Sequence, residues 1–421
     1  MYDEAPAVDY DQVVKIFKED FKCHPNDMFD DFEHTAVASA SIAQVHRAKL
    51  KDGTLVAVKV QKPNIRKQMN WDLMAYKCLM HMYEYFFDLP LTWTAETQDK
   101  HLRAEADFIS EGKNSERTKK DFEQITSLRD KVYIPKVFWD YTSKRVLTCE
   151  WIDGVKVTDK EGLAKQDVMK TTIDIFASQI FVTGFVHADP HPGNVFVRPH
   201  PNKSKKHYQI VLIDHGLYVE ESVVFRHQYS LFWKSLFMMD NDMIHQICHE
   251  WGINDPEMFA SATLMKPYRP KTALHIASNH KSIKWRWWSR YHWMLQTSYA
   301  FSPISRIMSF MRKIPIRSLS LLTGTFGGIY LIDDRYNART LQRNSLTIWN
   351  GICIGLDYKI NFRPDKGDKI DDLHERVAQR ILRVCKSNGG LYIKLGQAIQ
   401  VQSAILPPAY QKTFKTMYDE A

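Results

Sequence analysis

The chain has 421 residues, of which 44% are hydrophobic and 25% charged, so it has the length and composition of a globular protein of two lobes or domains. Its formal net charge of +8 suits contact with phosphates or an anionic membrane surface, but by itself it is no sign of nucleic-acid binding. The six cysteines lie far apart without a C-x-x-C pair, which argues against a zinc site or a disulfide framework and suits a reducing compartment.

The two ends of the sequence share a pentapeptide. MYDEA occurs as Met1–Ala5 and again as Met417–Ala421, and reading from the second copy into Ala5–Val8 gives one continuous segment. We therefore expect a circularly permuted chain whose natural order begins near residue 318. The first residues are acidic and not rich in arginine, which predicts no signal or transit peptide at this end.

The first predicted elements form a small lobe. Residues Tyr10–Phe21 read as a short amphipathic helix. A strand, a loop and a second strand then lead through a hairpin turn at Asp52-Gly53 into Val56–Val60. This order matches the small lobe of a kinase, where a phosphate-covering loop precedes a strand lysine that contacts the phosphates. Lys59 lies between two valines, so we expect its side chain on the face opposite to theirs.

The loop ahead of Lys59 departs from the kinase pattern. Alanine and serine stand at Ala38, Ser39, Ala40 and Ser41, where a kinase has glycines. Glycine lets the backbone approach phosphates in conformations that a Cβ forbids. We therefore expect these four residues to contact the nucleotide differently and to tune which nucleotide binds.

Two helices follow in the prediction, Arg66–Phe87 and an acidic helix over about Thr97–Ile125. On the acidic helix Glu105 falls within the apolar stripe and Glu111 lies at its edge. A carboxylate inside an apolar stripe is costly unless it meets a cation, and Lys59 is the natural candidate for Glu105. The alternative, a solvated helix face, suits the charged neighbours better than it suits Glu105.

A hinge between two lobes is predicted next. Strand-like runs near residues 132–134 and 145–149 precede Glu150, Trp151 and Ile152. In a two-lobed kinase the backbone of this segment would meet an adenine edge. From here to about residue 312 the sequence is helical and aromatic, which predicts the larger lobe.

The segment from residue 185 to residue 216 carries the most specific chemistry. Asp189 and Asn194 precede the apolar run Val195–Val197, and Asp214 ends the next apolar run. Phosphoryl transfer uses this order, in which one carboxylate orients the attacking hydroxyl or water and two further oxygen ligands hold Mg²⁺. Asp and Asn are also common in turns at strand ends. Together, in this spacing, they predict Asp189 as catalytic and Asn194 and Asp214 as ligands of Mg²⁺, which binds few protein groups.

Together these motifs resemble the aarF-domain-containing, or UbiB-type, atypical kinases. They are HADPHPGN, the alanine-serine loop ahead of QVHRA, VAVK, an E-x-D helix, IDHG and, near the end, the K-x-G-Q motif at Lys394–Gln397. The resemblance covers nearly the whole chain. In the family the K-x-G-Q segment precedes the kinase domain, whereas here it follows, in line with the expected permutation.

The resemblance implies an α+β, two-lobed protein-kinase-like fold with an added helical K-x-G-Q extension across the site where a protein substrate would bind. It divides the chain into residues 1–34, a helical linker that continues the extension, 35–152, the small lobe, 153–316, the large lobe, and 317–421, a membrane segment followed by the extension.

The resemblance also implies roles for particular residues. Lys59 would be the nucleotide lysine, and Lys394 and Gln397 would share a helix face that points into the cleft. Glu105 and Glu111 would partner Lys59 and Lys394, with the pairing left open. The implied cofactors are ATP or ADP and Mg²⁺. The implied partners are a lipid or quinone-like substrate, a membrane and a second copy of the chain, without nucleic acid.

The activity implied is that of an ATPase or a kinase of non-protein substrates, tied to coenzyme Q or lipid metabolism at the mitochondrial inner membrane. Two other functions stay open. A small-molecule kinase of the aminoglycoside- or choline-kinase sort would lack K-x-G-Q. A catalytically silent scaffold that binds nucleotide or lipid would be expected to have lost one of the polar site residues.

Two segments also keep two readings each. Ser318–Ile332 is an uncharged run of 15 residues, short for a span of about 20, and reads as a truncated membrane span or a buried hairpin. Trp285–Trp293 is a basic-aromatic cluster that reads as a packed helix with arginines stacked on rings or as a membrane-interface segment.

Overall fold

A computed structural model describes residues 7–87, 91–157, 165–190, 192–203, 207–264, 268, 333–334, 339–363, 367, 369–401 and 407–419. The chain forms two compact units, one of residues 1–179, 185–219 and 327–421, the other of residues 180–184 and 220–326. Both Trp285–Trp293 and Ser318–Ile332 lie outside the described residues, so their readings stay predictions. The four-part division predicted from the sequence also stays a prediction.

The strands are β1 (Asp31–Phe32), β2 (Ala38–Ser39), β3 (Ala43–Lys49), β4 (Leu55–Gln61), β5 (Val132–Tyr133), β6 (Val146–Glu150), β7 (Val155–Lys156), β8 (Phe185–His187), β9 (Val195–Pro199), β10 (Tyr208–Leu212) and β11 (Tyr218–Glu220). The helices of the first unit are α1 (Tyr10–Asp20), α2 (Pro25–Met28), α3 (Ile65–Phe87), α4 (Thr92–Glu105), α5 (Phe108–Gln124), α6 (Lys165–Ser178), α13 (Thr340–Asn361), α14 (Ile370–Asn388), α15 (Leu391–Val401) and α16 (Pro408–Asp419). Short turns of 3₁₀ or π helix lie at Trp139–Tyr141, Gln179–Thr183 and Pro192–Asn194.

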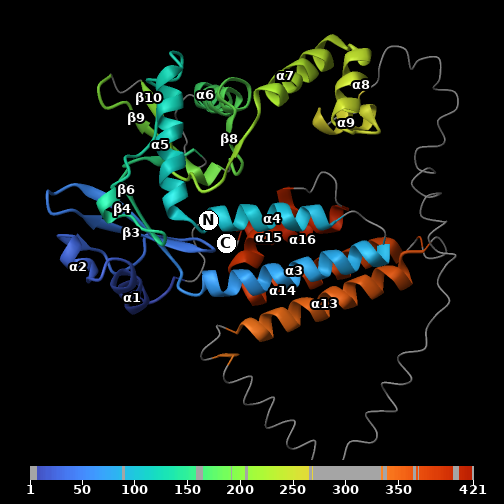
Figure 1. Ribbon diagram of the computed structural model, residues 1–421, viewed down its shortest axis with the longest axis horizontal. Coiled ribbons are helices and arrows are strands. Elements are labelled where there is room, and N and C mark those ends of the chain that lie inside the picture. The colour runs from blue at the N-terminus through green and yellow to red at the C-terminus, as the bar shows by residue number, and fades with distance from the viewer. Residues whose placement is uncertain are drawn as a thin grey trace, which may run out of the picture. The chain divides into compact units, whose positions relative to one another are not determined.

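The small lobe is an antiparallel sheet in the order β1-β3-β4-β6, with β2 paired to β3 (Figure 1). The predicted turn at Asp52-Gly53 joins β3 to β4, and Gly53 takes a positive φ of 89° that favours glycine. One face of the sheet is buried against α1 and the segment after it. Its core includes Val56, Val58 and Phe17. The alternation of VAVKV therefore places the valines inward, as predicted.

The acidic helix differs from the prediction, because it is two helices rather than one. α4 ends at Glu105, and α5 begins at Phe108 with Asp107 as its N-cap, whose carboxylate accepts the N–H of Ile109 at 3.2 Å. Asp at an N-cap competes with continued helix and favours a new helix start. The break turns the two glutamates onto separate helices, which decides the cations they meet.

A second sheet has the order β5-β10-β9-β7, and β8 pairs with β11 in a separate sheet of two strands. β9 and β10 form the predicted antiparallel hairpin, with Val195 opposite Leu212. Buried apolar residues of this hairpin pack against α6 through Ile175 and Val168. The hairpin thus holds the residues before β9 and after β10 at one edge.

The K-x-G-Q extension is a layer of helices packed on α3. The helices α14, α15 and α16 share a core that includes Leu373, Val377 and Phe414. Helices α3 and α13 run parallel, since Asp72 meets Arg343, and Tyr83 donates to the carbonyl of Gly351 at 2.8 Å. Figure 1 shows these helices stacked alongside the small lobe.

The second unit contains α7 (Val223–Met238), α8 (Asn241–Glu250) and α9 (Pro256–Thr263). Phe232, Ile244 and Cys248 are among its buried residues. Together the sheets and helices make an α+β protein, as predicted. No helix within the described parts of the chain is long and apolar enough to cross a membrane.

The buried ion pair between α3 and α13 yields the first prediction. Asp72 Oδ2 lies 2.6 Å from Arg343, and the two side chains are only 3% and 10% exposed. An Asp72→Ala variant should lose about 3–5 kcal/mol of unfolding free energy, because Arg343 would stay buried without its partner. The measurement is urea unfolding.

The matched control is the double variant Asp72→Leu with Arg343→Met, which replaces the pair with apolar groups. It should recover most of the loss. A single Asp72→Ala change of less than about 1 kcal/mol would mean that the pair does not join the two helices energetically.

Candidate active site

Lys59 projects from β4 on the face opposite to the core of Val56 and Val58. Its neighbours Val58 and Val60 are buried against α1, whereas Lys59 lies opposite Leu147 and Val45 on the half-buried face. The face is therefore fixed by strand alternation, as the sequence predicts. The ammonium also lies 5.2 Å from the centre of the Phe108 ring at the start of α5.

Two carboxylates hold the Lys59 ammonium. Glu111 accepts it through both oxygens, at 2.7 and 3.0 Å, and Asp214 lies 3.4 Å away. The Glu111 side chain is only 2% exposed. An ion pair of this kind is costly to bury unless the geometry is good, and here the lysine bridges a helix to the segment that follows β10.

A second lysine lies at the same site, from the far end of the sequence. Lys394 on α15 forms an ion pair with Glu105 at 2.6 Å, and its ammonium is 3.9 Å from Asp189 Oδ2. The expectation that Lys59 would neutralise Glu105 is therefore wrong. Because the acidic helix breaks after Glu105, this residue meets Lys394, and Glu111 on the next helix meets Lys59.

His187 links Asp189 and Asp214 through the backbone. Its Nδ1 accepts the N–H of Asp189 at 3.1 Å, so the proton is on Nε2, which donates to the carbonyl of Asp214 at 3.0 Å. His187 is buried, and its backbone N–H donates a hydrogen bond to Gln179 Oε1 at 3.1 Å. This histidine fixes the spacing between Asp189 and Asp214.

The Asp-His-Gly turn after β10 is tied to α5. Asp214 Oδ1 accepts the N–H of Gly216 at 2.9 Å, and the His215 carbonyl accepts the amide of Asn114 at 3.0 Å. A Cβ on Gly216 would lie 3.3 Å from Asp214 Oδ1 and 3.8 Å from Glu111. Glycine at this position leaves room for the two carboxylates to approach Lys59.

The charged side chains of the site shift one another's pKa values. Burial opposes ionisation of Asp214, but Lys59 and Lys394 outweigh it and hold the pKa of this carboxyl below its usual range. Burial raises the pKa of Glu111 to about 6 despite Lys59. Burial also opposes the charge on both lysines, yet the facing carboxylates raise the pKa of each above its ordinary value. At neutral pH both lysines are therefore cations.

The alanine-serine loop is a tight β-hairpin between β2 and β3. The N–H of Ala40 donates to the carbonyl of Ala43 at 2.8 Å. Lys62, just after β4, donates its ammonium to the carbonyl of Ala40 at 2.6 Å and its backbone N–H to the carbonyl of Ile42 at 2.9 Å. Burial lowers the pKa of Lys62 to about 8. The contact of Ala38, Ser39, Ala40 and Ser41 with a nucleotide stays a prediction.

Some backbone groups of the predicted hinge already make hydrogen bonds within the protein. Glu150 and Trp151 donate their backbone N–H groups to Lys136 and Leu55, at 2.9 and 3.1 Å. The Glu150 carboxylate accepts the hydroxyl of Tyr133. Of the backbone donors of the three predicted residues, this leaves the N–H of Ile152 for an adenine edge.

Asn194 and Asp214 have the donor chemistry for Mg²⁺. Both side chains offer hard oxygen atoms. The backbone carbonyl of Asn194 accepts the N–H of Ile213 at 3.2 Å, which keeps Asn194 beside Asp214. No cluster of three or more His, Cys, Asp or Glu side chains suited to a metal occurs among the described residues. Two protein ligands fit an ion that takes the rest of its shell from phosphate and water.

Several contributing residues escaped the sequence reading. His187 entered the sequence analysis only within the HADPHPGN motif, and Lys62 was given no role. Cys149 lies opposite Ala57 on the same face of the sheet as Lys59, and burial raises the pKa of its thiol to about 12, so the thiol is neutral. Strand alternation from Lys59 could have found Ala57 and Cys149. Gln397 lies on α15, but its side chain is outside the described set.

Comparison with known proteins matches this arrangement to a family. The model of the ABC1 atypical kinase-like domain matches residues 1–248, a range that contains the site residues from Lys59 to Asp214 but not Lys394. An ABC1 family protein of Schizosaccharomyces pombe is 40% identical over 293 residues, covering 68% of this chain and 54% of the relative. AarF domain-containing kinase 1 of Drosophila melanogaster is 36% identical over 259 residues, covering 60% and 49%.

Among solved structures, a complex of Rv3197 with erythromycin from Mycobacterium tuberculosis is similar with a TM-score of 0.46 and 21% identity. The match covers 58% of this chain and 61% of that chain. The chain spans about half the length of the curated relatives it matches.

The small-lobe sheet, the strand lysine paired with a helix glutamate and the Asp-Asn-Asp order define a protein-kinase-like fold. The chain belongs to the ABC1, or aarF-domain, family of atypical kinase-like proteins. The predicted family and fold class are thereby confirmed. The permuted order of its segments stays a prediction.

The separate pairing of the two glutamates yields the second prediction. Glu111→Gln should weaken binding of ADP with Mg²⁺ roughly tenfold, because Lys59 loses the anion that holds it in place. Glu105→Gln releases Lys394 instead and should change that affinity by less than about twofold. Isothermal titration calorimetry measures both, with melting temperatures as the check on folding. Equal losses in the two variants would contradict the pairing.

The buried histidine of the Asp-His-Gly turn yields the third prediction. Burial lowers the pKa of His215 to about 4, so the folded protein keeps this ring neutral while the unfolded chain protonates it near pH 6.5. The contribution is complete above pH 6.5 and is lost as the pH falls towards 4. Between about pH 7.5 and pH 5 it should cost about 2 kcal/mol of unfolding free energy.

The His215→Phe variant isolates this effect. Its unfolding free energy, measured in urea at the two pH values, should fall by about 2 kcal/mol less than that of the parent. Parallel curves for parent and variant would mean that His215 does not titrate in this range.

Proposed function

We propose that this chain is an ATP-dependent atypical kinase or ATPase that binds nucleotide with Mg²⁺ and transfers the γ-phosphoryl group to water or a non-protein acceptor. The observation that carries the proposal is the Lys59–Glu111 ion pair beside Asp214. A strand lysine held by a helix glutamate next to a metal-binding aspartate is the arrangement that positions nucleotide phosphates in kinases.

The chain's own residues account for nucleotide binding. The Ile152 N–H meets the base, and Lys59 meets the phosphates. Asn194 and Asp214 hold Mg²⁺, which neutralises phosphate charge when bound. The alanine-serine loop, tied back by Lys62, covers the phosphates without the close backbone approach that glycines allow.

Asp189 is the group that handles the acceptor. Its side chain is 45% exposed, so a hydroxyl or a water molecule can reach it. The acceptor oxygen forms a bond to the γ-phosphorus while the bond from that phosphorus to the β,γ-bridging oxygen breaks. The acceptor proton passes to Asp189, and ADP leaves with the bridging oxygen. Buried His187 keeps Asp189 at its distance from Asp214.

Lys394 supports an acceptor other than a protein chain. Its ammonium lies 3.9 Å from Asp189 and is held by Glu105, so α15 fills space beside the catalytic aspartate. A small hydroxyl compound or water needs less room there than an extended peptide. A phenolic lipid or quinone-like acceptor, with a role in coenzyme Q or lipid homeostasis at the mitochondrial inner membrane, is the substrate class proposed.

The runner-up is a silent scaffold that binds nucleotide without turning it over. It would use the same Lys59–Glu111 ion pair to bind nucleotide and would differ only in the lack of turnover. An aminoglycoside- or choline-type kinase is less favoured, because the extension helices pack on α3 and bring Lys394 into the site.

The fourth prediction separates binding from turnover. Asp189→Asn should keep nucleotide affinity within about threefold and lower ATP turnover at least about 100-fold, because the acceptor loses its base. Asp214→Asn should lose both, because an amide replaces the anionic metal ligand. The readouts are ADP release with Mg²⁺ and calorimetric affinity for ADP with Mg²⁺.

Asp174→Asn, an exposed change on α6, is the matched control and should leave both quantities as in the parent. Nucleotide affinity without turnover in the parent, with liposomes and phenolic lipids present, would replace the enzyme by the scaffold. Turnover that survives Asp189→Asn would remove this residue from the chemistry.

A further inference from the structure

The side of helix α13 that faces solvent is apolar. Of its exposed residues, Ser345 is the one that is not apolar. Leu341, Ile348, Trp349, Ile352, Leu356 and Ile360 fall on an arc of about 120° along its length. Trp349 is 65% exposed and Ile360 is 52% exposed. A solvated helix face is normally polar, so this apolar face marks a binding surface.

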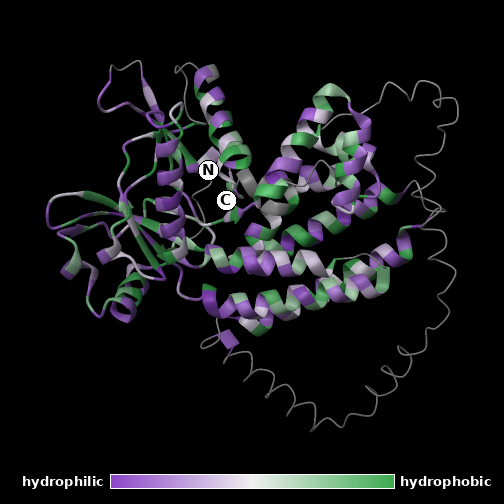
Figure 2. Ribbon diagram, turned by 45° about the horizontal axis from the view of Figure 1, so that its top comes forward, coloured by the Kyte–Doolittle hydropathy of each residue, from purple (hydrophilic) through white to green (hydrophobic). Residues whose placement is uncertain are grey.

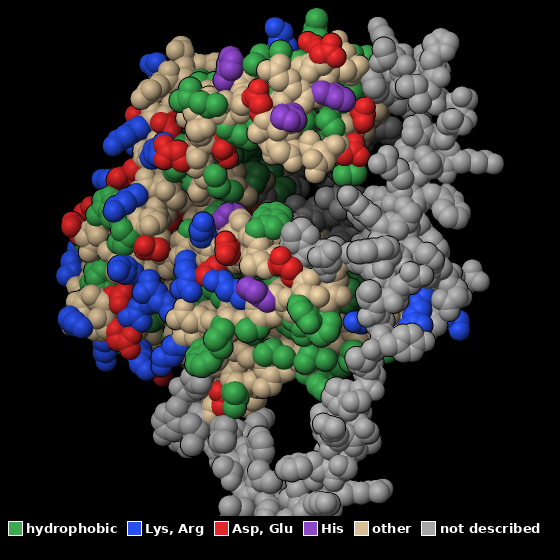
Figure 3. Space-filling model, turned by 45° about the vertical axis from the view of Figure 1, so that its right-hand side comes forward, with side chains coloured by type: hydrophobic (Ala, Val, Ile, Leu, Met, Phe, Trp, Pro, Cys, Tyr) green, Lys and Arg blue, Asp and Glu red, His purple; other side chains and the backbone are tan. Residues whose placement is uncertain are grey.

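Helix α3 continues the surface. Trp71, Met74, Tyr85 and Phe86 are exposed on it, with Tyr85 84% exposed. On each helix the exposed apolar residues are rotated about a third of a turn around the helix axis from the residues that contact the other helix. The rotation is clockwise on one helix and anticlockwise on the other. Because the helices run parallel, both sets face the same side. Figure 2 shows green along both helices, and Figure 3 shows hydrophobic side chains gathered low on the molecule, where these helices lie.

The two helices pack so closely that their exposed apolar residues form one continuous surface. A Cβ on Gly351 of α13 would lie 2.3 Å from Leu79 of α3. At one end the Lys359 ammonium lies 5.0 Å from the centre of the Phe86 ring. We call the exposed apolar residues of α3 and α13 the α3–α13 face.

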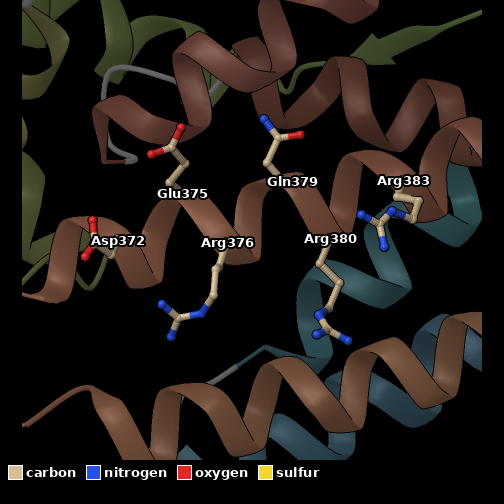
Figure 4. A pocket seen from close by; sticks show the side chains of 6 residues that line it. All are labelled: Asp372, Glu375, Arg376, Gln379, Arg380 and Arg383. Carbon is tan, nitrogen blue, oxygen red and sulfur yellow. The ribbon is translucent and has the colours of Figure 1, made fainter.

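Basic side chains lie along the edges of the α3–α13 face. Neither helix has an aspartate or glutamate among its exposed residues, whereas Arg66 and Lys67 are exposed at the start of α3. On α14, Arg376, Arg380 and Arg383 line an open hollow of about 650 Å³ together with Asp372, Glu375 and Gln379. Arg376 and Arg380 point towards the neighbouring helix, and Glu375 and Gln379 point the other way (Figure 4).

Contacts identify that neighbouring helix as α13. Arg376 bonds Asp357 at 2.8 Å, and Arg380 reaches Asn350 at 3.5 Å. The arginines therefore border the α3–α13 face on the side away from α3. The arrangement is an apolar belt with tryptophan and tyrosine in it and cations along its edges.

We propose that the α3–α13 face docks on the surface of an anionic phospholipid bilayer, with both helices lying in the interface and Arg380 and Arg383 of α14 on lipid phosphates. Helices of this length with an apolar face, interfacial aromatics and flanking cations bind membranes in this way. A second copy of the chain is a poorer occupant, because a two-fold contact through this face brings like-charged arginine edges towards each other. The inference does not depend on nucleotide turnover.

The test is co-sedimentation of the full chain with vesicles of phosphatidylcholine alone and of equimolar phosphatidylcholine and phosphatidylglycerol. The parent should bind the anionic vesicles at least about tenfold more tightly, and added salt should weaken this binding. Trp349→Ser with Ile352→Ser should weaken binding to the anionic vesicles at least about tenfold, because both side chains enter the apolar layer. Arg380→Gln with Arg383→Gln should remove most of the preference for anionic lipid.

The matched control is Phe237→Ser with Met238→Ser on α7, at positions that are 75% and 72% exposed. It should bind vesicles as the parent does. Leu356→Ser with Ile360→Ser repeats the test at a second pair on the same face, and melting temperatures confirm folding in each variant.

Parent-like vesicle binding by both α13 variants, or an equal loss in the α7 control, would overturn the proposal. So would a parent that ignores vesicles and forms a dimer in light scattering that Trp349→Ser with Ile352→Ser dissociates, since the face would then belong to a second copy. Loss of vesicle binding with unchanged affinity for ADP supports docking independently of the nucleotide site.

Discussion

Burying charge beside charge is the constraint on which the site depends. Six ionisable side chains meet there: Lys59, Lys394, Glu105, Glu111, Asp189 and Asp214. Two lysines against four carboxylates leave a surplus of negative charge, which suits a divalent cation and tightens the hold on each lysine. Removing Lys59 or Lys394 leaves a glutamate that is at most 11% exposed without its cation. The break in the acidic helix puts the two glutamates on separate helices, Glu105 at the end of α4 and Glu111 in the first turn of α5.

The helices inserted after Lys59 support the K-x-G-Q extension. α3 begins four residues after β4 and packs against α13, while Leu391 at the start of α15 joins the core between α3, α5 and the sheet. Lys394 therefore reaches the cleft through packing on α3 and not through its place in the sequence. This explains how residues more than 300 positions apart make one site. It also separates two roles of α3, which carries the extension on one side and the exposed α3–α13 face on another.

Local patterns in the sequence predicted much of the fold. Period-two alternation placed Lys59, and the turn at Asp52-Gly53 and the β9–β10 hairpin followed from turn chemistry and apolar runs. The break at Asp107 was missed, because an N-cap inside a helical pattern resembles an ordinary polar residue. The partners of the two glutamates could not be predicted, since they depend on long-range packing of α15. The role of His187 depends on two backbone contacts that no spacing encodes.

The central claim is that each glutamate serves its own lysine, and double-mutant cycles on unfolding free energy test it most directly. Each glutamate is changed to glutamine and each lysine to methionine, singly and in pairs. Glu111 with Lys59 and Glu105 with Lys394 should show coupling energies on the order of 1–3 kcal/mol, and Glu105 with Lys59 should show less than about 0.5 kcal/mol. Strong coupling of Glu105 to Lys59, with none between Glu105 and Lys394, would contradict the account.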